Sequence, residues 1–178
     1  MRAAITLLAS LFAFVALTPQ DARADACASI AEKLAAKRKE YRSLIEENGW
    51  WGSTSKASPR SKAAYEVNAE HLPPVKRGKM PLPDDAEGLY SKAIPDPAAE
   101  GTTWWARDSA GNFHRFQGGA RGPNNELIVH WNGSTAPTKV GTSIPLDRVP
   151  GYIKKRYGLR DEIIKLVDDL AEAMASGK

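Results

Sequence analysis

The residues best suited to chemistry in this sequence are His130, Arg115 and Glu126, which lie in one short stretch of the chain. A histidine can take up or give up a proton near neutral pH, a guanidinium binds two phosphate oxygens at once, and a carboxylate offers a second acid or base. Metal-independent cleavage of RNA needs such groups: a base for the 2′-hydroxyl, an acid for the departing 5′-oxygen and a cation for the phosphate. On one strand Glu126 and His130 would be about 13 Å apart, so they would flank a substrate rather than share a proton.

Other side chains nearby are candidates for binding the same substrate. A hydroxyl can donate a hydrogen bond to phosphate, basic side chains draw in a polyanion, and an indole ring can stack on a base. The hydroxyl candidates are Ser134 and Thr135, and the basic candidates are Arg121, Lys139 and Lys154. The indole candidates are Trp105 and Trp131. The simpler interpretation is that Arg115 and His130 are cross-strand neighbours on a solvated face.

The sequence contains no recognisable metal or cofactor motif. Its three histidines are far apart, HExxH is absent, and a single cysteine, Cys27, rules out a cysteine-rich zinc site. There is also no G-x-S-x-G motif for serine hydrolysis. We therefore expect no cofactor, and we expect His71 to be a helix-terminal histidine hydrogen-bonded to backbone. A zinc nuclease using His71 with His114 or His130 remains a separate hypothesis, which a chelator would test.

The stretch from Thr102 to Thr135 must position these groups, and its pattern predicts an antiparallel β-meander of three or four strands. Ser109–Asn112 has the composition of a tight hairpin turn. On the last strand Leu127, Val129 and Trp131 alternate with His130, which predicts that His130 lies on the face away from the core.

We expect Gln117 to pair with Glu126 and Phe116 with Leu127, because this register buries Phe116. Arg115 would then lie beside Ile128 on the same face as His130. The loop between these two strands is expected at residues 118–125.

The rest of the chain predicts one α+β domain in which two helices flank the meander. Apolar residues at helical spacing predict helices over residues 25–48 and 150–175, and Gly158 is a candidate break in the second. Residues 49–101 form a loop-rich lead-in, with Pro73-Pro74 ending any regular structure before it. The length of the chain after residue 24 suits a single domain.

The N-terminus predicts export. Residues 1–24 contain a basic Arg2, an apolar run over 5–17 and a small-x-small site ending at Ala24, as in a signal peptide. We expect cleavage there and a periplasmic or secreted mature chain of residues 25–178. No other segment reaches about 18 apolar residues, so no membrane span is expected in the mature chain. The chain has 25 Lys and Arg against 21 Asp and Glu, and this mild excess permits an anionic partner without demonstrating one.

Several short motifs resemble the C-terminal toxin domains of bacterial polymorphic toxins of the Rhs and contact-dependent inhibition type. They are Pro81–Ala86, Trp105–Asp108 with Gly111, Phe113–Phe116 and Val129–Gly133. The resemblance covers about residues 80–134 and implies a ribonuclease with Arg115 and His130 as the pair to test. It also implies an RNA substrate and a small acidic inhibitor protein that protects the producing cell. The chain differs in having its own signal peptide and a longer loop over 118–125.

Besides the zinc nuclease, the sequence thus leaves two functional hypotheses. The first is an exported, metal-independent ribonuclease of toxin type. The alternative is a non-catalytic periplasmic or secreted module that binds its partner through the Trp-rich face of the sheet.

Overall fold

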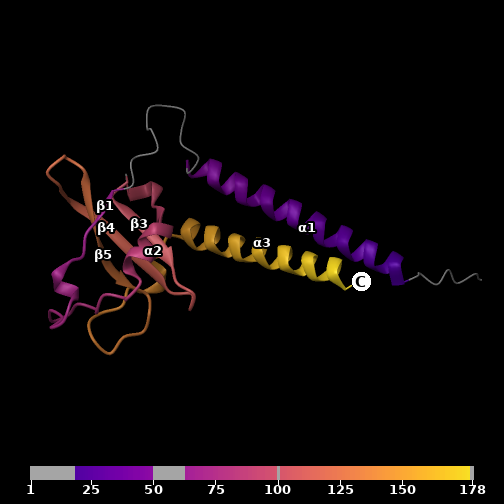
Figure 1. Ribbon diagram of the computed structural model, residues 1–178. Coiled ribbons are helices and arrows are strands. Elements are labelled where there is room, and N and C mark those ends of the chain that lie inside the picture. Colours follow the sequence, from indigo (N-terminus) through magenta and orange to yellow (C-terminus); the bar gives the residue numbers. More distant parts are fainter. Residues whose placement is uncertain (1–18, 50–62, 100, 177–178) are drawn as a thin grey trace, which may run out of the picture.

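A computed structural model describes residues 19–49, 63–99 and 101–176, and it shows a small sheet domain from which a long pair of helices extends (Figure 1). The helices are α1 (Pro19–Glu47), α2 (Ala86–Lys92) and α3 (Gly151–Ala175), with 3-10 turns at Ala69–His71, Pro97–Ala99 and Leu146–Arg148. The strands are β1 (Ala64–Tyr65), β2 (Ile94–Pro95), β3 (Thr103–Arg107), β4 (Phe113–Arg121) and β5 (Leu127–Ser134).

The α+β class is confirmed, but the sheet has two more strands than the meander and is mixed. The strand order is β1-β5-β4-β3-β2, and all neighbours are antiparallel except β1 and β5, which are parallel. The predicted meander is its centre, β3 to β5. The added strands β1 and β2 come from the lead-in and are two residues long each, which is too short to give an alternating pattern in the sequence.

The predicted register between β4 and β5 is wrong. Gln117 pairs with His130 and Phe116 with Trp131, and β4 continues through the segment expected to be a loop as far as Arg121. The pairing shifts at two irregularities, between His114 and Phe116 and between Gly118 and Ala120. A Cβ on Gly118 would lie 2.7 Å from the Leu127 side chain, so glycine permits this close approach. As a result the hairpin is longer than expected, and its loop is residues 122–126.

Each face of the sheet has its own core. On one face Ala106, Phe116, Val129 and Trp131 are at most 2% exposed and pack with Leu89 and Tyr90 of α2. The opposite face is covered by the segment leading into α3 and by the first turns of that helix, and its core residues are Trp105, Phe113, Ile144, Val149, Ile153 and Tyr157. The alternation in β5 therefore predicted its core face correctly.

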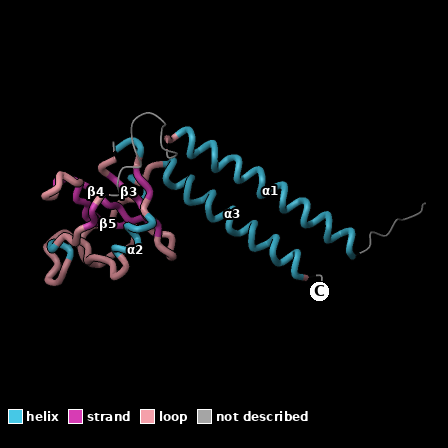
Figure 2. Tube along the Cα trace, turned by 45° about the horizontal axis from the view of Figure 1, so that its top comes forward, coloured by secondary structure: helices cyan, strands magenta, loops and turns pink. Residues whose placement is uncertain are grey.

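The two long helices, α1 and α3, pack side by side as an antiparallel helix pair (Figure 2), although the whole sheet domain lies between them in the sequence. Apolar residues recur at heptad spacing where the helices meet, with Cys27, Ile30, Leu34, Tyr41 and Leu44 on α1 and Leu159, Ile163, Leu166 and Leu170 on α3. Lys37 forms an ion pair with Glu162 across this seam (2.7 Å). Both predicted helices are thus present, and α3 continues unbroken past Gly158.

The N-terminal helix begins earlier than expected. Residues 1–18 of the predicted signal peptide lie outside the described residues, and residues 19–24 form the first turns of α1. Arg23 Nε donates to the carbonyl of Ala173 (3.0 Å), so in the full chain this turn packs against the end of α3.

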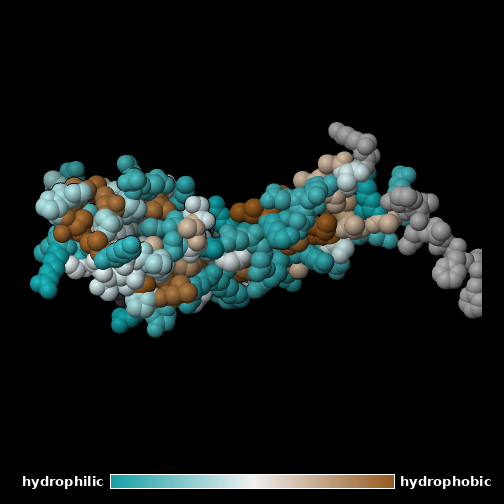
Figure 3. All heavy atoms as spheres, turned by 90° about the horizontal axis from the view of Figure 1, so that it is seen from below, coloured by the Kyte–Doolittle hydropathy of each residue, from teal (hydrophilic) through white to brown (hydrophobic). Residues whose placement is uncertain are grey.

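The sheet domain contacts the helix pair through the first turns of α3. Tyr157 Oη donates to the backbone carbonyl of Trp105 (3.1 Å), and Arg107 forms an ion pair with Asp161. The surface of the helix pair is mostly hydrophilic with separate apolar patches (Figure 3). Ile164, Val167 and Met174 of α3 are exposed. In the part of the chain that the structure describes, no helix is both long and apolar enough to cross a membrane.

Candidate functional site

Two adjoining hollows lie beside β4 and β5 and share three lining residues, His71, Lys79 and Asn132. The first, the histidine hollow, has a volume of about 370 Å³ and is lined by these three with Asn68, Gln117, Gly118, Gly119, Ala120, His130 and Trp131. The second, the arginine hollow, has about 280 Å³ and is lined by the shared three with Gly78, Met80, Arg115, Gly133, Thr142, Ser143, Ile144, Pro145 and Arg148. Together they are as large as a small-molecule site, for which roughly 300–1,000 Å³ is usual.

His130 enters the histidine hollow from β5. Glu66 follows β1 and donates its N–H to the carbonyl of Val129 (2.9 Å). The carbonyl oxygen of Glu66 then lies 2.9 Å from His130 Nδ1. A carbonyl oxygen can only accept, so Nδ1 must carry a proton, and in the neutral ring Nε2 keeps its lone pair. His130 is therefore held in the tautomer that can act as a base through Nε2.

His71 is held in the same way from the other side of the hollow. It ends the 3-10 turn Ala69–His71, in which Asn68 Oδ1 accepts from the N–H of Glu70 (3.0 Å). Its Nδ1 lies 2.7 Å from the carbonyl oxygen of Met80, and its ring packs edge-on against Trp131 with centroids 4.9 Å apart. The expectation of a backbone-bonded histidine is confirmed for Nδ1. The same bond leaves Nε2 of the neutral ring as an acceptor. His71 lines both hollows, although the residue is only 4% exposed.

His114 differs because both of its ring nitrogens are used inside the protein. Nδ1 accepts from the indole N–H of Trp131 (3.2 Å), and Nε2 donates to Asp108 (3.1 Å). The residue is 4% exposed. Burial by itself would raise the pKa of Asp108, but hydrogen bonds from Asn112 and His114 outweigh it and lower that pKa. His114 is therefore a structural residue.

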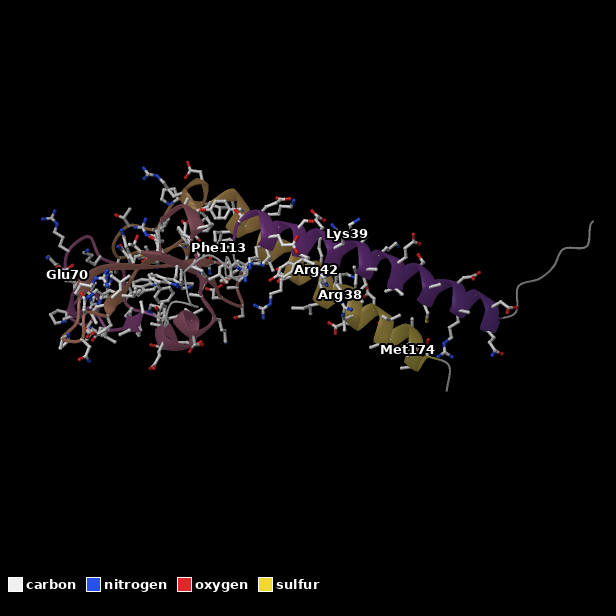
Figure 4. All side chains as sticks on the ribbon, turned by 90° about the horizontal axis from the view of Figure 1, so that it is seen from above. Arg38, Lys39, Arg42, Glu70, Phe113 and Met174 are labelled. Atoms are coloured by element: carbon white, nitrogen blue, oxygen red, sulfur yellow. The ribbon has the colours of Figure 1, made fainter. Side chains whose placement is uncertain are left out.

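The two hollows have cationic and neutral lining residues and no acidic ones among the described residues. Lys79, Arg115 and Arg148 supply the charge. Burial, and then the charge of Arg148, lower the pKa of Arg115. Glu70 forms ion pairs with Lys79 (3.2 Å) and with Lys76, but it does not line either hollow. Glu70 lies in the sheet domain, at the end of the molecule away from the helices, whereas Arg38 lies part-way along α1 and Met174 near the far end of α3 (Figure 4).

Arg115 is positioned by a chain of amides. Asn132 Nδ2 donates to Gln117 Oε1 (2.7 Å), and Asn132 Oδ1 accepts a long bond from Arg115 Nη2 (3.4 Å). The Nε of Arg115 is buried and has no hydrogen-bond partner among the described residues. A buried donor without a partner costs free energy, so this side chain is suited to an acceptor from outside the protein.

Of the predicted site residues, three line the hollows: Arg115, His130 and the buried Trp131. Arg115 and His130 lie on the same face of the sheet, as the alternation predicted, and line adjoining hollows. Glu126 is not with them, because its carboxylate caps the hairpin loop by accepting from the N–H of Asn124 (2.8 Å). Arg121 donates to the carbonyl of Asn125 in the same loop (2.9 Å). The longer hairpin thus separates both residues from the hollows.

The other substrate-binding predictions are also not supported by their positions. Trp105 and Trp131 are 3% and 2% exposed, so neither indole ring can stack on a base. The Ser134 hydroxyl accepts from the N–H of Ala136 (3.0 Å), and the Thr135 hydroxyl accepts from the N–H of Phe113 (2.9 Å), so both stabilise the turn after β5. Neither Lys139 nor Lys154 lines a hollow.

The sequence did not single out Lys79 at all, and it gave His71 a structural role or, in the separate zinc hypothesis, a metal-binding one. Both residues reach the hollow from the segment between the first and second helices, which has few regular elements. The short run Glu70–Pro74 is the available signal, because the leucine before Pro-Pro is restricted to extended backbone, which ends the turn that carries His71. That signal does not reveal which strand the histidine meets.

No three His, Cys, Asp or Glu side chains among residues 19–49, 63–99 and 101–176 are grouped so that they could hold a metal ion. Comparison of the chain with protein-family models, with curated proteins and with solved structures finds no significant similarity.

Proposed function

We propose that the protein is a metal-independent ribonuclease in which His71 and His130 form the acid–base pair. The observation that carries this proposal is that both imidazoles line one hollow with Lys79 and are fixed by backbone carbonyls through Nδ1, which directs their catalytic role to Nε2. The substrate class follows from the cations that line the two adjoining hollows, Lys79, Arg115 and Arg148, which favour a phosphodiester.

The reaction assigned to the pair is attack of a ribose 2′-oxygen on the adjacent phosphorus. One neutral imidazole takes the 2′-hydroxyl proton at Nε2 while the other, protonated, gives its Nε2 proton to the departing 5′-oxygen. The bond between phosphorus and the 5′-oxygen breaks, which leaves a 2′,3′-cyclic phosphate and a 5′-hydroxyl. Lys79 stabilises the negative charge that grows on the phosphate oxygens.

Incubation of the purified mature chain with total RNA, with and without a chelator, tests this function. The wild type is expected to cleave RNA equally in both conditions. His71→Gln and His130→Gln should each lower the rate by roughly 10²–10⁴-fold, the usual contribution of a proton-transfer group. Lys92→Ala, an exposed lysine outside both hollows, is the control. Full activity in either histidine variant would overturn the assignment.

We also propose that the enzyme acts after export and that the producing cell is protected by a small acidic inhibitor protein. An acidic surface is complementary to hollows lined by cationic and neutral residues. A small acidic protein encoded beside this chain should block cleavage at a molar ratio near one. The alternative of a Trp-rich binding face is not favoured, because Trp104, Trp105 and Trp131 are buried in the sheet domain.

A further inference from the structure

The arginine hollow contains binding groups that the proposed cleavage reaction does not use. The reacting imidazoles require only the histidine hollow and Lys79. The arginine hollow adds two guanidinium groups, Arg115 and Arg148, and two hydroxyl groups, Thr142 and Ser143. These groups come from β4 and from the loop between β5 and α3, and together they form a second polar site beside the first.

The charge of this second site is not neutralised within the described residues. Neither Arg115 nor Arg148 takes part in a described ion pair, and no carboxylate lines the hollow. The two guanidinium groups are close enough for Arg148 to lower the pKa of Arg115. Placing like charges together in a partly buried position costs free energy unless an anion joins them, so the site is complementary to an anion.

The wall of the site is built by a close backbone approach. Gly141 has φ +79°, and a Cβ there would lie 2.3 Å from the backbone of Lys79. Glycine therefore lets the loop carrying Thr142 and Ser143 pack directly against the segment that carries Lys79. The same lysine lines both hollows, so a ligand that spans them passes Lys79 on its way.

We propose that the arginine hollow is a subsite for the phosphate next to the one that is cleaved, held by Arg115 and Arg148. This inference rests on the proposed ribonuclease function and specifies its substrate as a chain with at least two consecutive phosphates. Arg115 then binds a phosphate, as the sequence predicted, but this phosphate is the one next to the phosphate that reacts. A guanidinium is suited to this role because its planar fork binds two phosphate oxygens.

Short substrates test the subsite by cleavage. A dinucleoside monophosphate carries only the reacting phosphate, whereas the same dinucleotide with an added 5′- or 3′-phosphate carries a second one. We expect the added phosphate on one of the two sides to raise kcat/KM about tenfold through KM, which corresponds to about 1.4 kcal/mol. In Arg148→Ala this ratio should fall below about twofold, whereas in Lys92→Ala it should stay near tenfold. If the wild type cleaves every substrate equally well, the subsite is wrong and the ribonuclease stands.

Binding of uncleavable 2′-deoxy analogues separates the subsite from the reaction. These analogues lack the attacking hydroxyl, so calorimetry with and without the terminal phosphate reports affinity alone. A tenfold gain in affinity that Arg148→Ala removes supports the subsite, even if no RNA is cleaved and the ribonuclease proposal fails. Equal affinity for both analogues would overturn the subsite.

Discussion

His114→Ala should lower the free energy of unfolding without removing a proposed catalytic group, because this histidine is buried between Trp131 and Asp108. The substitution leaves the indole N–H of Trp131 buried without an acceptor, at a cost of about 1–3 kcal/mol. It also removes most of an imidazole from a packed core, which adds to the loss. We therefore expect the free energy of unfolding to fall by roughly 2–4 kcal/mol.

His130→Ala provides the contrast. It removes one hydrogen bond at the partly exposed edge of the sheet, to the carbonyl of Glu66, so the expected loss is about 0.5–1.5 kcal/mol. Urea unfolding followed by tryptophan fluorescence measures both variants, and RNA cleavage is measured on each at a temperature where it stays folded. The expected pattern is a destabilised, active His114 variant and a stable, inactive His130 variant. An undiminished unfolding free energy in His114→Ala, or equal losses of stability in the two variants, would refute the separation of structural and catalytic histidines.

Three further predictions concern charges and titration. Burial raises the pKa of Tyr90 to about 12. The stability that the neutral Tyr90 contributes is therefore complete below about pH 10, the pKa of an unfolded tyrosine, and is lost as the pH rises to about 12. Tyr90→Phe should flatten this loss of unfolding free energy, measured by urea unfolding across that range. Asp108 has a lowered pKa, so Asp108→Asn should destabilise the protein at pH 7, and the difference from wild type should shrink as the pH falls through 4. The ion pair of Arg107 with Asp161 is partly exposed, with side chains 30% and 55% exposed, so Asp161→Asn should change the unfolding free energy by about 1 kcal/mol or less. A larger change would mean that this ion pair is important for attaching the helix pair to the sheet domain.

The face of the sheet that carries the site could be predicted from sequence because alternation is local. Leu127, Val129 and Trp131 define the core side of β5, which places His130 opposite to them whatever the pairing. The tight turn at residues 109–112 was equally readable, and Gly111 adopts the expected positive φ of 88°. These features depend on neighbours in the chain, and they were correct.

The register and the composition of the site could not be predicted, because both depend on contacts between distant residues. The pairing of Gln117 with His130 follows from the short loop at residues 122–126 and the register shift between Gly118 and Ala120, and glycine at position 118 is compatible with a loop as well as with a strand. His71 and Lys79 lie far from β5 in the sequence, and several contacts bring their segment to the site. The carbonyl of Glu66 accepts from His130, the carbonyl of Met80 accepts from His71, and the His71 ring packs against Trp131. Trp105 was assigned to substrate because alternation does not show that both faces of this sheet are covered, whereas alternation had already placed Trp131 on the core side of β5.

The pH dependence of kcat/KM for RNA cleavage, measured in the presence of chelator, tests the central claim most directly. Two imidazoles acting as base and acid require one to be neutral and the other protonated, so the profile measured from about pH 5 to 8 should be bell-shaped. His71→Gln and His130→Gln should each lower the maximum, and the double variant should be hardly slower than either one, because the two groups act as a unit. A flat profile over this range, or losses that multiply in the double variant, would contradict the account.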